Sequence, residues 1–96
     1  MRIAYVVGST VSTIKDELLR GTKLLIVREA TVTGEVVGEP FIAVDGVGAG
    51  SGELVLVAEG SAARQTRTTR DAPVDATIVG IIDSLEVDGT FTFRKG

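Results

Sequence analysis

Short apolar runs that end at turn residues constrain the fold of this chain of 96 residues more than any other feature. Runs of about four to eight residues rich in Val, Ile and Leu indicate β-strands, whereas a helix needs about ten or more residues with a 3.6-residue period. No helical pattern of useful length separates these runs. The sequence therefore predicts strands at residues 3–7, 23–27, 41–44, 54–58, 76–82, 85–87 and 91–93.

Glycines mark two of the predicted connections. Gly34 interrupts a β-prone stretch, residues 30–37, and indicates a bulge or a hairpin turn there. Asp88 and Gly89 are a strong signal for a two-residue turn, so we expect the chain to end in a β-hairpin. The run 54–58 shows no alternation with polar residues, which indicates a strand covered on both faces.

We expect one or two short helical turns and no longer helix. In the first turn, Thr13 and Asp16 resemble a capping box and Gly21 resembles a C-terminal stop. The second turn is expected at residues 60–65, with Ser61 as its N-cap.

Composition supports an all-β fold with a small core. Hydrophobic residues make up 44% of the chain, but three Phe and one Tyr are its only aromatic residues, so the core must consist mainly of Val, Ile and Leu. A chain of this length has one core and room for little else. We therefore expect a single domain, residues 1–96, built as a small closed or nearly closed barrel.

The residue types argue against several classes of function. The chain has neither Cys nor His, so it lacks disulfides, thiolate metal sites and the commonest general base. Its net charge of −3 argues against general affinity for nucleic acid. It shows no signal peptide and no apolar run of about 20 residues, so the default location is the cytoplasm, without membrane contact. We expect no enzymatic activity, no catalytic residue, no metal and no cofactor.

A glycine-spaced loop precedes the run 54–58. Residues 44–53 read Val-Asp-Gly-Val-Gly-Ala-Gly-Ser-Gly-Glu, and a backbone without side chains lets a partner approach closely. A phosphate is a poor candidate for that partner, because the glycine spacing misses the dinucleotide fingerprint and a β-rich run follows where a helix is needed. An ordinary hairpin loop without a partner and a contact with a neighbouring copy of the chain both stay open.

Short motifs follow one another in a specific order along the chain. They are Thr13 and Lys15; Gly21 and Lys23-Leu24-Leu25; Val44-Asp45, Val47-Gly48-Ala49-Gly50, Gly52-Glu53 and Val55-Leu56; Gly60-Ser61 and Ala63-Arg64; Pro73-Val74-Asp75; and Ile78-Val79-Gly80-Ile81-Ile82-Asp83. In this order the motifs resemble those of the pentameric vertex proteins of bacterial microcompartments, a family found in carboxysomes and in ethanolamine-utilising compartments. The Gly-Ala-Gly-x-Gly-Glu block at 48–53 is specific in that context.

This resemblance implies an all-β, five-stranded barrel of the OB-like type and a homopentamer that caps the fivefold vertices of a microcompartment shell in the cytoplasm. It also implies a structural role without catalysis, a narrow axial pore, and hexameric shell proteins as further partners. The residues expected at the subunit interface or pore are Asp45, Gly46, Gly48, Ala49, Gly50, Ser51, Gly52 and Glu53, with Ser61 and Arg64 as further interface candidates.

Several acidic residues have plainer alternative roles. Glu53 is expected either to accept backbone or Arg64 hydrogen bonds across the subunit contact or to be a solvated acid at the start of a strand. Asp45, Asp75 and Asp83 are carboxylates of the type that binds Mg²⁺, but each lies at the boundary of a run, so turn and strand-end roles are favoured.

The alternative function class is a small OB-like binding module for nucleic acid or another extended ligand, since such barrels host many functions. A protein that binds single strands needs a basic groove with aromatic platforms. This chain is acidic, and no aromatic residue is interleaved with Arg67 and Arg70, which we expect in a solvated loop. The sequence therefore favours the vertex protein over the binding module.

Overall fold

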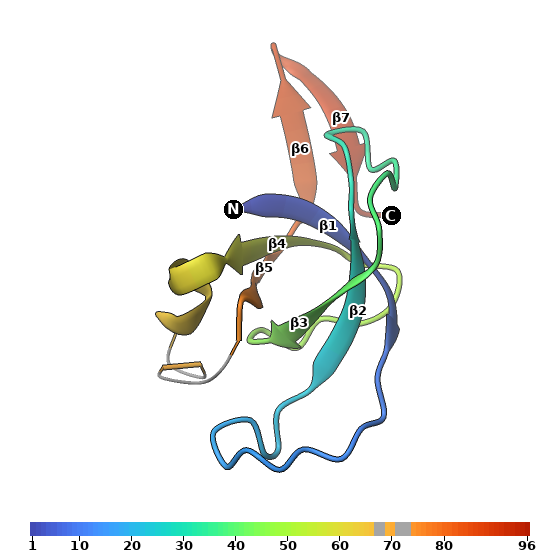
Figure 1. Cartoon of the computed structure of the whole chain (residues 1–96). Coiled ribbons are helices and arrows are strands. Elements are labelled where there is room, and N and C mark those ends of the chain that lie inside the picture. The colour runs from blue at the N-terminus through green and yellow to red at the C-terminus, as the bar shows by residue number, and fades with distance from the viewer. Residues whose placement is uncertain (67–68, 71–73) are drawn as a thin grey trace.

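Five strands close a barrel in the computed structural model, which describes residues 1–66, 69–70 and 74–96 (Figure 1). The strands follow the order β1-β2-β3-β5-β4 around the barrel, and β4 pairs back with β1. This order confirms the expected all-β, five-stranded barrel of the OB-like type. The strands are β1 (Arg2–Ser9), β2 (Leu24–Glu29), β3 (Phe41–Asp45), β4 (Leu54–Glu59) and β5 (Ala76–Ile81).

The barrel core consists of small and medium-sized aliphatic side chains. Successive side chains of a strand point to opposite faces, so alternate residues of each strand supply this core. Complete burial of one Val, Leu or Ile side chain stabilises the fold by about 1.5–3 kcal/mol. The buried cluster comprises Ala4, Val6, Leu25, Val27, Ala43, Ala49, Val55, Val57, Ala76 and Ile78.

Strand β4 is covered on both faces, as its uninterrupted apolar run predicts. Val55 and Val57 point into the barrel core. Leu54 belongs to a second buried cluster, together with Ala30 and Ile82, outside the barrel. The prediction for this strand is therefore confirmed.

The seam between β3 and β5 is the shortest pairing in the barrel. The two strands run parallel and pair only at Val44 with Thr77 and at Asp45 with Ile78. Strand β1, by contrast, pairs with β2 between Ala4 and Ser9 and with β4 between Arg2 and Tyr5. Within the described part of the chain, residues 41–43 therefore have no pairing strand on the β5 side.

A C-terminal hairpin projects from one end of the barrel (Figure 1). It is formed by β6 (Ser84–Val87) and β7 (Thr90–Arg94), which pair only with each other. At its base, Leu85 and Phe93 pack against the second buried cluster. The predicted terminal hairpin is confirmed, and these contacts fix it to the barrel.

Both predicted glycine turns are present. Asp88 has φ 52° and Gly89 has φ 81°, so both residues have the positive φ that a type I′ hairpin turn requires. Gly34 has φ 84° in a tight turn that an antiparallel bridge between Ala30 and Val36 closes. The hairpin-turn alternative for residues 30–37 is therefore correct.

One of the two expected helical turns is present as a 3₁₀ helix. This helix, η1 (Gly60–Arg64), follows β4 directly and buries Ala63. Its N-cap residue is Glu59 and no side chain caps it, so the assignment of Ser61 as N-cap is wrong. The N-cap lies two residues earlier than expected, because Gly60 with φ 61° already turns the chain at the end of β4.

Residues 10–22, which we call the arm, lead from β1 toward β2 without a helix, and the other expected helical turn is only a turn at residues 17–21. The backbone N–H of Leu18 donates to Asp16 Oδ1 at 2.8 Å, so Asp16 and not Thr13 caps the turn. Gly21 has φ 84°, as a stop residue requires. The arm lies at the end of the barrel opposite the hairpin, and the molecule measures 45 × 24 × 21 Å (Figure 1).

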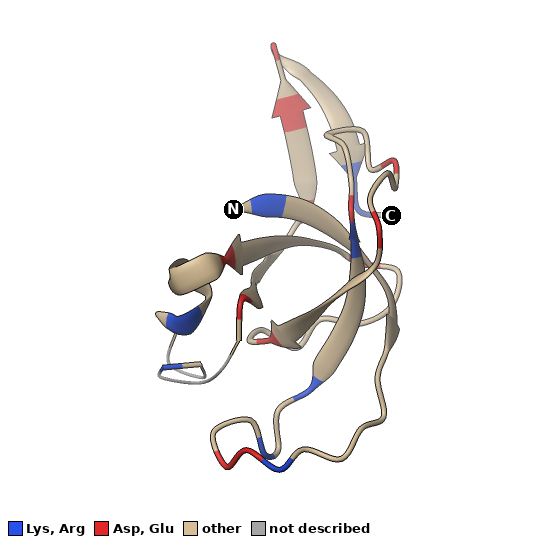
Figure 2. Cartoon of the chain, in the orientation of Figure 1, with Lys and Arg blue, Asp and Glu red and all other residues tan. Residues whose placement is uncertain are grey.

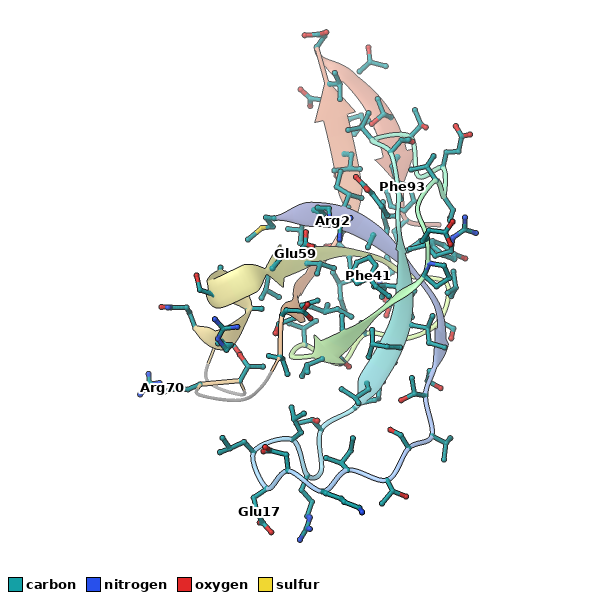
Figure 3. The ribbon with its side chains drawn as sticks, viewed as in Figure 1. Arg2, Glu17, Phe41, Glu59, Arg70 and Phe93 are labelled. Atoms are coloured by element: carbon teal, nitrogen blue, oxygen red, sulfur yellow. The ribbon has the colours of Figure 1, made fainter. Side chains whose placement is uncertain are left out.

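No helix within residues 1–66, 69–70 and 74–96 is long and apolar enough to cross a membrane. Arg67 and Pro73 lie outside the described residues. Of the predicted solvated arginine loop, the structure therefore describes Arg70, which is exposed (Figure 3).

Candidate functional site

The glycine-spaced loop between β3 and β4 is shaped by the carboxylate of Asp45. Its Oδ1 atom accepts three backbone hydrogen bonds, from Val47 at 3.0 Å, Gly48 at 3.0 Å and Ala49 at 3.1 Å. Only 4% of the Asp45 side chain is exposed, and Lys23 Nζ lies 3.5 Å from its Oδ2. An Asp side chain that bonds to the backbone two to four residues onward stabilises a turn. The turn role predicted for Asp45 is confirmed.

A second carboxylate, Glu53, closes the other end of the loop. Its Oε1 accepts the N–H of Gly50 at 2.7 Å, and its Oε2 lies 2.8 Å from Lys95 Nζ. The hydrogen bond from Lys95, and then that from Gly50, lower the pKa of Glu53 below its ordinary value. The same carboxylate raises the pKa of Lys95. Glu53 is therefore held as an anion by groups of its own chain.

Backbone hydrogen bonds attach the loop to the barrel. Gly52 N–H donates to Val6 O at 2.9 Å, and Val6 N–H donates to Glu53 O at 3.0 Å. Lys23 Nζ donates to Ala49 O at 2.7 Å, and the Ala49 side chain is fully buried in the core. The loop is therefore a fixed part of the barrel, with one residue inside it.

The loop requires glycine at different positions for different structural reasons. Gly48 and Gly52 have φ values of 81° and 88°, which residues with a Cβ rarely adopt. At Gly46 a Cβ would lie 2.9 Å from Ile78 O, so the close backbone approach there is to β5 of the same chain. Gly50 has neither a positive φ nor a close neighbour, since its Cβ would meet only Glu53 Oε1 at 3.8 Å. No contact within the described chain therefore accounts for a glycine at position 50.

The outer surface of the loop is open. Gly46, Gly48, Ser51 and Gly52 are exposed, as is Val47 at 41%. The exposed residues form two short stretches, 46–48 and 51–52, between the less exposed Asp45, Ala49 and Glu53. The loop can therefore present backbone to another molecule without losing its own hydrogen bonds.

The two further interface candidates lie on η1, outside the loop. Ser61 and Arg64 are both exposed. Arg64 Nη1 donates to Val74 O at 3.1 Å, whereas Glu53 pairs with Lys95. Within one chain these two residues have different partners, and the hydrogen bond expected between Arg64 and Glu53 across a subunit contact stays a prediction.

No metal centre is formed by the acidic residues at the run boundaries. In the part of the chain that the structure describes, no three His, Cys, Asp or Glu side chains are grouped closely enough to hold an ion. Asp83 lies in the connection to the hairpin, where its carbonyl oxygen accepts Lys95 N–H at 2.8 Å. Asp75 immediately precedes β5.

A charged cluster that sequence reasoning missed joins four strands around Arg2 (Figure 3). The Arg2 guanidinium forms a bidentate pair with Glu59, with Nη2 to Oε2 at 2.7 Å, and its Nη1 lies 3.2 Å from Glu29 Oε1. The guanidinium also lies 4.7 Å from the centre of the Phe41 ring. The hydrogen bond with Glu59 is the main cause of a raised pKa for Arg2. No local sequence signal predicts the cluster, since its acids lie 27 and 57 residues from Arg2.

Comparison with known proteins gives consistent similarities over nearly the whole chain. The family described as "Ethanolamine utilisation protein EutN/carboxysome" matches residues 1–83. The carboxysome shell vertex protein CcmL of Synechococcus elongatus is 42% identical over 95 residues, which are 99% of this chain and 96% of that protein.

Solved structures agree with the sequence comparison. The structure of CcmL from Nostoc sp. PCC 7120 superposes with a TM-score of 0.91 at 44% identity and covers 99% of this chain and 100% of that one. The pentameric microcompartment shell protein GrpN from Rhodospirillum rubrum superposes with a TM-score of 0.81 at 45% identity, over 91% of this chain and 99% of that one.

Proposed function

This chain belongs to the EutN/carboxysome family of microcompartment shell vertex proteins, and we propose that it assembles into homopentamers that cap the fivefold vertices of such a shell. Its role is structural and not enzymatic, and its place is the shell of a compartment in the cytoplasm. The observation that carries the proposal is the similarity over nearly the full length of both chains to vertex proteins, one of them described as pentameric.

The geometry of a closed shell gives this role its physical reason. Hexagonal tiles cover flat facets, so a closed polyhedron also needs fivefold units at its corners. A ring of identical chains needs a heterologous interface, in which one patch meets a different patch on the next copy. We propose hexameric shell proteins as the partners at the outer edge of this ring.

The loop 45–53 is the proposed site of close approach between subunits or around an axial pore. Its support is the open outer surface at Gly48, Ser51 and Gly52, together with the lack of an intrachain reason for Gly50. Ser61 and Arg64 are proposed as additional interface residues, since both are exposed on η1. The internal hydrogen bonds of the loop would let it keep its shape in the assembly.

Within residues 1–66, 69–70 and 74–96, the surface that the binding-module alternative requires is not formed. Phe41 lies under Arg2, Phe93 packs in the second cluster, and Arg94 covers the Phe91 ring at 4.0 Å, so these rings are not free platforms for bases. Figure 2 shows basic and acidic residues interspersed along the described ribbon. Neither property favours a nucleic-acid groove.

Native mass spectrometry of the purified chain tests the proposal. The expected species at micromolar concentration has five times the mass of one chain. A monomer or a dimer as the main species would contradict the vertex role. Denatured spectra of the same sample provide the control, since they give the mass of the single chain.

A further inference from the structure

The outer face of the barrel carries a small apolar layer where β2 and β3 lie side by side. Leu25 and Ala43 belong to the barrel core. Their chain neighbours Leu24 and Val44, which pair with each other across the two strands, therefore point outward. Val44 is nevertheless only 2% exposed, although it lies outside the core cluster. Its burial therefore depends on residues that cover the outside of the barrel.

Leu19, on the arm, supplies part of that cover. It lines an apolar recess of about 200 Å³ together with Leu24, Val44 and Val74, among others. The recess lies at the seam where β3 and β5 pair over only two residues. Leu19 is half-buried, whereas its neighbour Leu18 is 50% exposed and does not line the recess. Leu19 is therefore the apolar contact of the arm with this face.

No hydrogen bond holds Leu19 or its neighbours to the barrel. Within the described chain, residues 11–21 form hydrogen bonds only with one another and with Thr22. Movement of Leu19 out of the recess therefore breaks no hydrogen bond to the barrel. It costs only the apolar contact of the side chain.

The tip of the arm, residues 16–22, is held together by its own hydrogen bonds. Asp16 accepts two of them, from Leu18 N–H through Oδ1 at 2.8 Å and from Leu19 N–H through its backbone oxygen at 3.1 Å. Thr22 N–H donates to Leu19 O at 3.0 Å. Because all these partners lie within the tip, the bonds persist when the tip moves relative to the barrel. Leu19 therefore moves with the tip as one unit.

Space beside the tip allows this movement. An open cavity of about 320 Å³ lies between the part of the arm that leaves β1 and the part that enters β2. In Figure 1 the arm is a wide loop beyond the end of the barrel, and in Figure 3 Glu17, at its tip, points away from the barrel. Segments with few contacts to the core are those that open locally at a low free energy. The arm has the properties of such a segment.

We propose that the arm is a strap that opens and closes over the outer apolar face of the barrel, with Leu19 as its latch in the recess between β3 and β5. The first end of the strap stays fixed, because Thr10 N–H donates to Leu24 O at 3.1 Å. The second end is fixed by Asp45 N–H, which donates to Lys23 O at 2.9 Å. The closed strap shields apolar surface that would otherwise be open to non-specific contact.

Thiol labelling tests the strap, because the natural chain contains no Cys. Val44→Cys reports opening of the strap. Val57→Cys, at a position fully buried in the barrel core, reports unfolding of the whole barrel. With a maleimide reagent under native conditions, Val44→Cys should react at least about tenfold faster than Val57→Cys, because local opening is more frequent than global unfolding.

Substitution of two adjacent leucines tests the latch. Leu19→Ala should raise the labelling rate of Val44→Cys by about tenfold and leave that of Val57→Cys unchanged, because apolar contact alone closes the strap. Leu18→Ala is the matched control and should change neither rate, since Leu18 does not line the recess. Circular dichroism checks that each variant keeps the barrel.

Two results would overturn the strap. Equal labelling rates for Val44→Cys and Val57→Cys would show that Val44 is exposed only when the whole chain unfolds. Equal effects of Leu19→Ala and Leu18→Ala would show that Leu19 is not the latch. Native mass spectrometry of the unlabelled samples reports the ring separately, so either result would leave the vertex role standing.

Discussion

The Glu53 carboxylate lies 2.8 Å from the Lys95 ammonium, so the loop between β3 and β4 is tied to the penultimate residue of the chain. The two residues are 42 positions apart. Glu53 lies inside the segment that matches the family and Lys95 lies beyond it. The hairpin therefore does more than extend the barrel, because it places a cation against the loop that we propose for the subunit contact.

The first prediction concerns the pH dependence of this pair. The pKa of Glu53 is lower in the folded chain than its ordinary value of 4.5, so its contribution to stability is complete above that pH. The contribution is lost as the pH falls through the lowered folded-state pKa. We expect the urea midpoint of the wild type to fall more than that of Glu53→Gln as the pH is lowered from 6 to below about 4.

Lys95→Met is the matched control for that experiment, since it removes the cation and leaves Glu53 in place. We expect its midpoint to be less sensitive to acid than that of the wild type, in the same direction as Glu53→Gln. Equal acid sensitivity of all three proteins would show that the pair contributes nothing to the stability of the fold. All midpoints need the same protein concentration, because assembly contributes to apparent stability.

The second prediction concerns Asp45, whose Oδ1 accepts three backbone hydrogen bonds. Asp45→Ala leaves these N–H groups without their acceptor and should lower the free energy of unfolding by about 2 kcal/mol or more. Asp45→Asn keeps an acceptor oxygen at the same place and should lower the free energy of unfolding by clearly less than Asp45→Ala does. Urea unfolding followed by circular dichroism measures both variants. Equal costs would contradict the turn role of this carboxylate.

The third prediction separates the glycines of the loop. Gly48→Ala places a Cβ on a residue with φ 81° and should cost about 1–2 kcal/mol in a single subunit. Gly50→Val meets no such strain, since Gly50 lacks a positive φ and a close neighbour. We expect Gly50→Val to keep the barrel by circular dichroism but to lose the ring by native mass spectrometry. An intact ring in that variant would place Gly50 away from the subunit contact.

Local sequence signals predicted most of the fold. The apolar runs gave the barrel strands, and Asp88 with Gly89 gave the terminal hairpin, because a positive φ at both turn residues is encoded within two positions. The signals for caps were less reliable. Thr13 and Ser61 have the right residue type for an N-cap, but the arm forms no helix and η1 begins earlier, at Gly60.

The charged pairs of the candidate site were beyond local prediction. Arg2 with Glu59 and Lys95 with Glu53 connect positions 57 and 42 residues apart, and only the closed barrel brings them together. The glycine loop was recognised as a place of close approach, yet at Gly46 the approaching group is Ile78 O of the same chain. A sequence shows that a backbone needs space but not which group uses it.

The last prediction concerns the shell itself. Hexagonal tiles can extend a sheet or a tube without limit, but they cannot close a corner, so a cell that lacks this chain should form elongated or open compartments. The enclosed enzymes should stay active in a lysate, because the chain contributes position and not chemistry. Wild-type chain supplied in trans should restore closed polyhedra in electron micrographs, whereas a variant that native mass spectrometry shows to be monomeric should not. Normal closed shells in the deletion strain, in the absence of a second vertex protein, would contradict the vertex role and restore the OB-like binding module as the leading hypothesis.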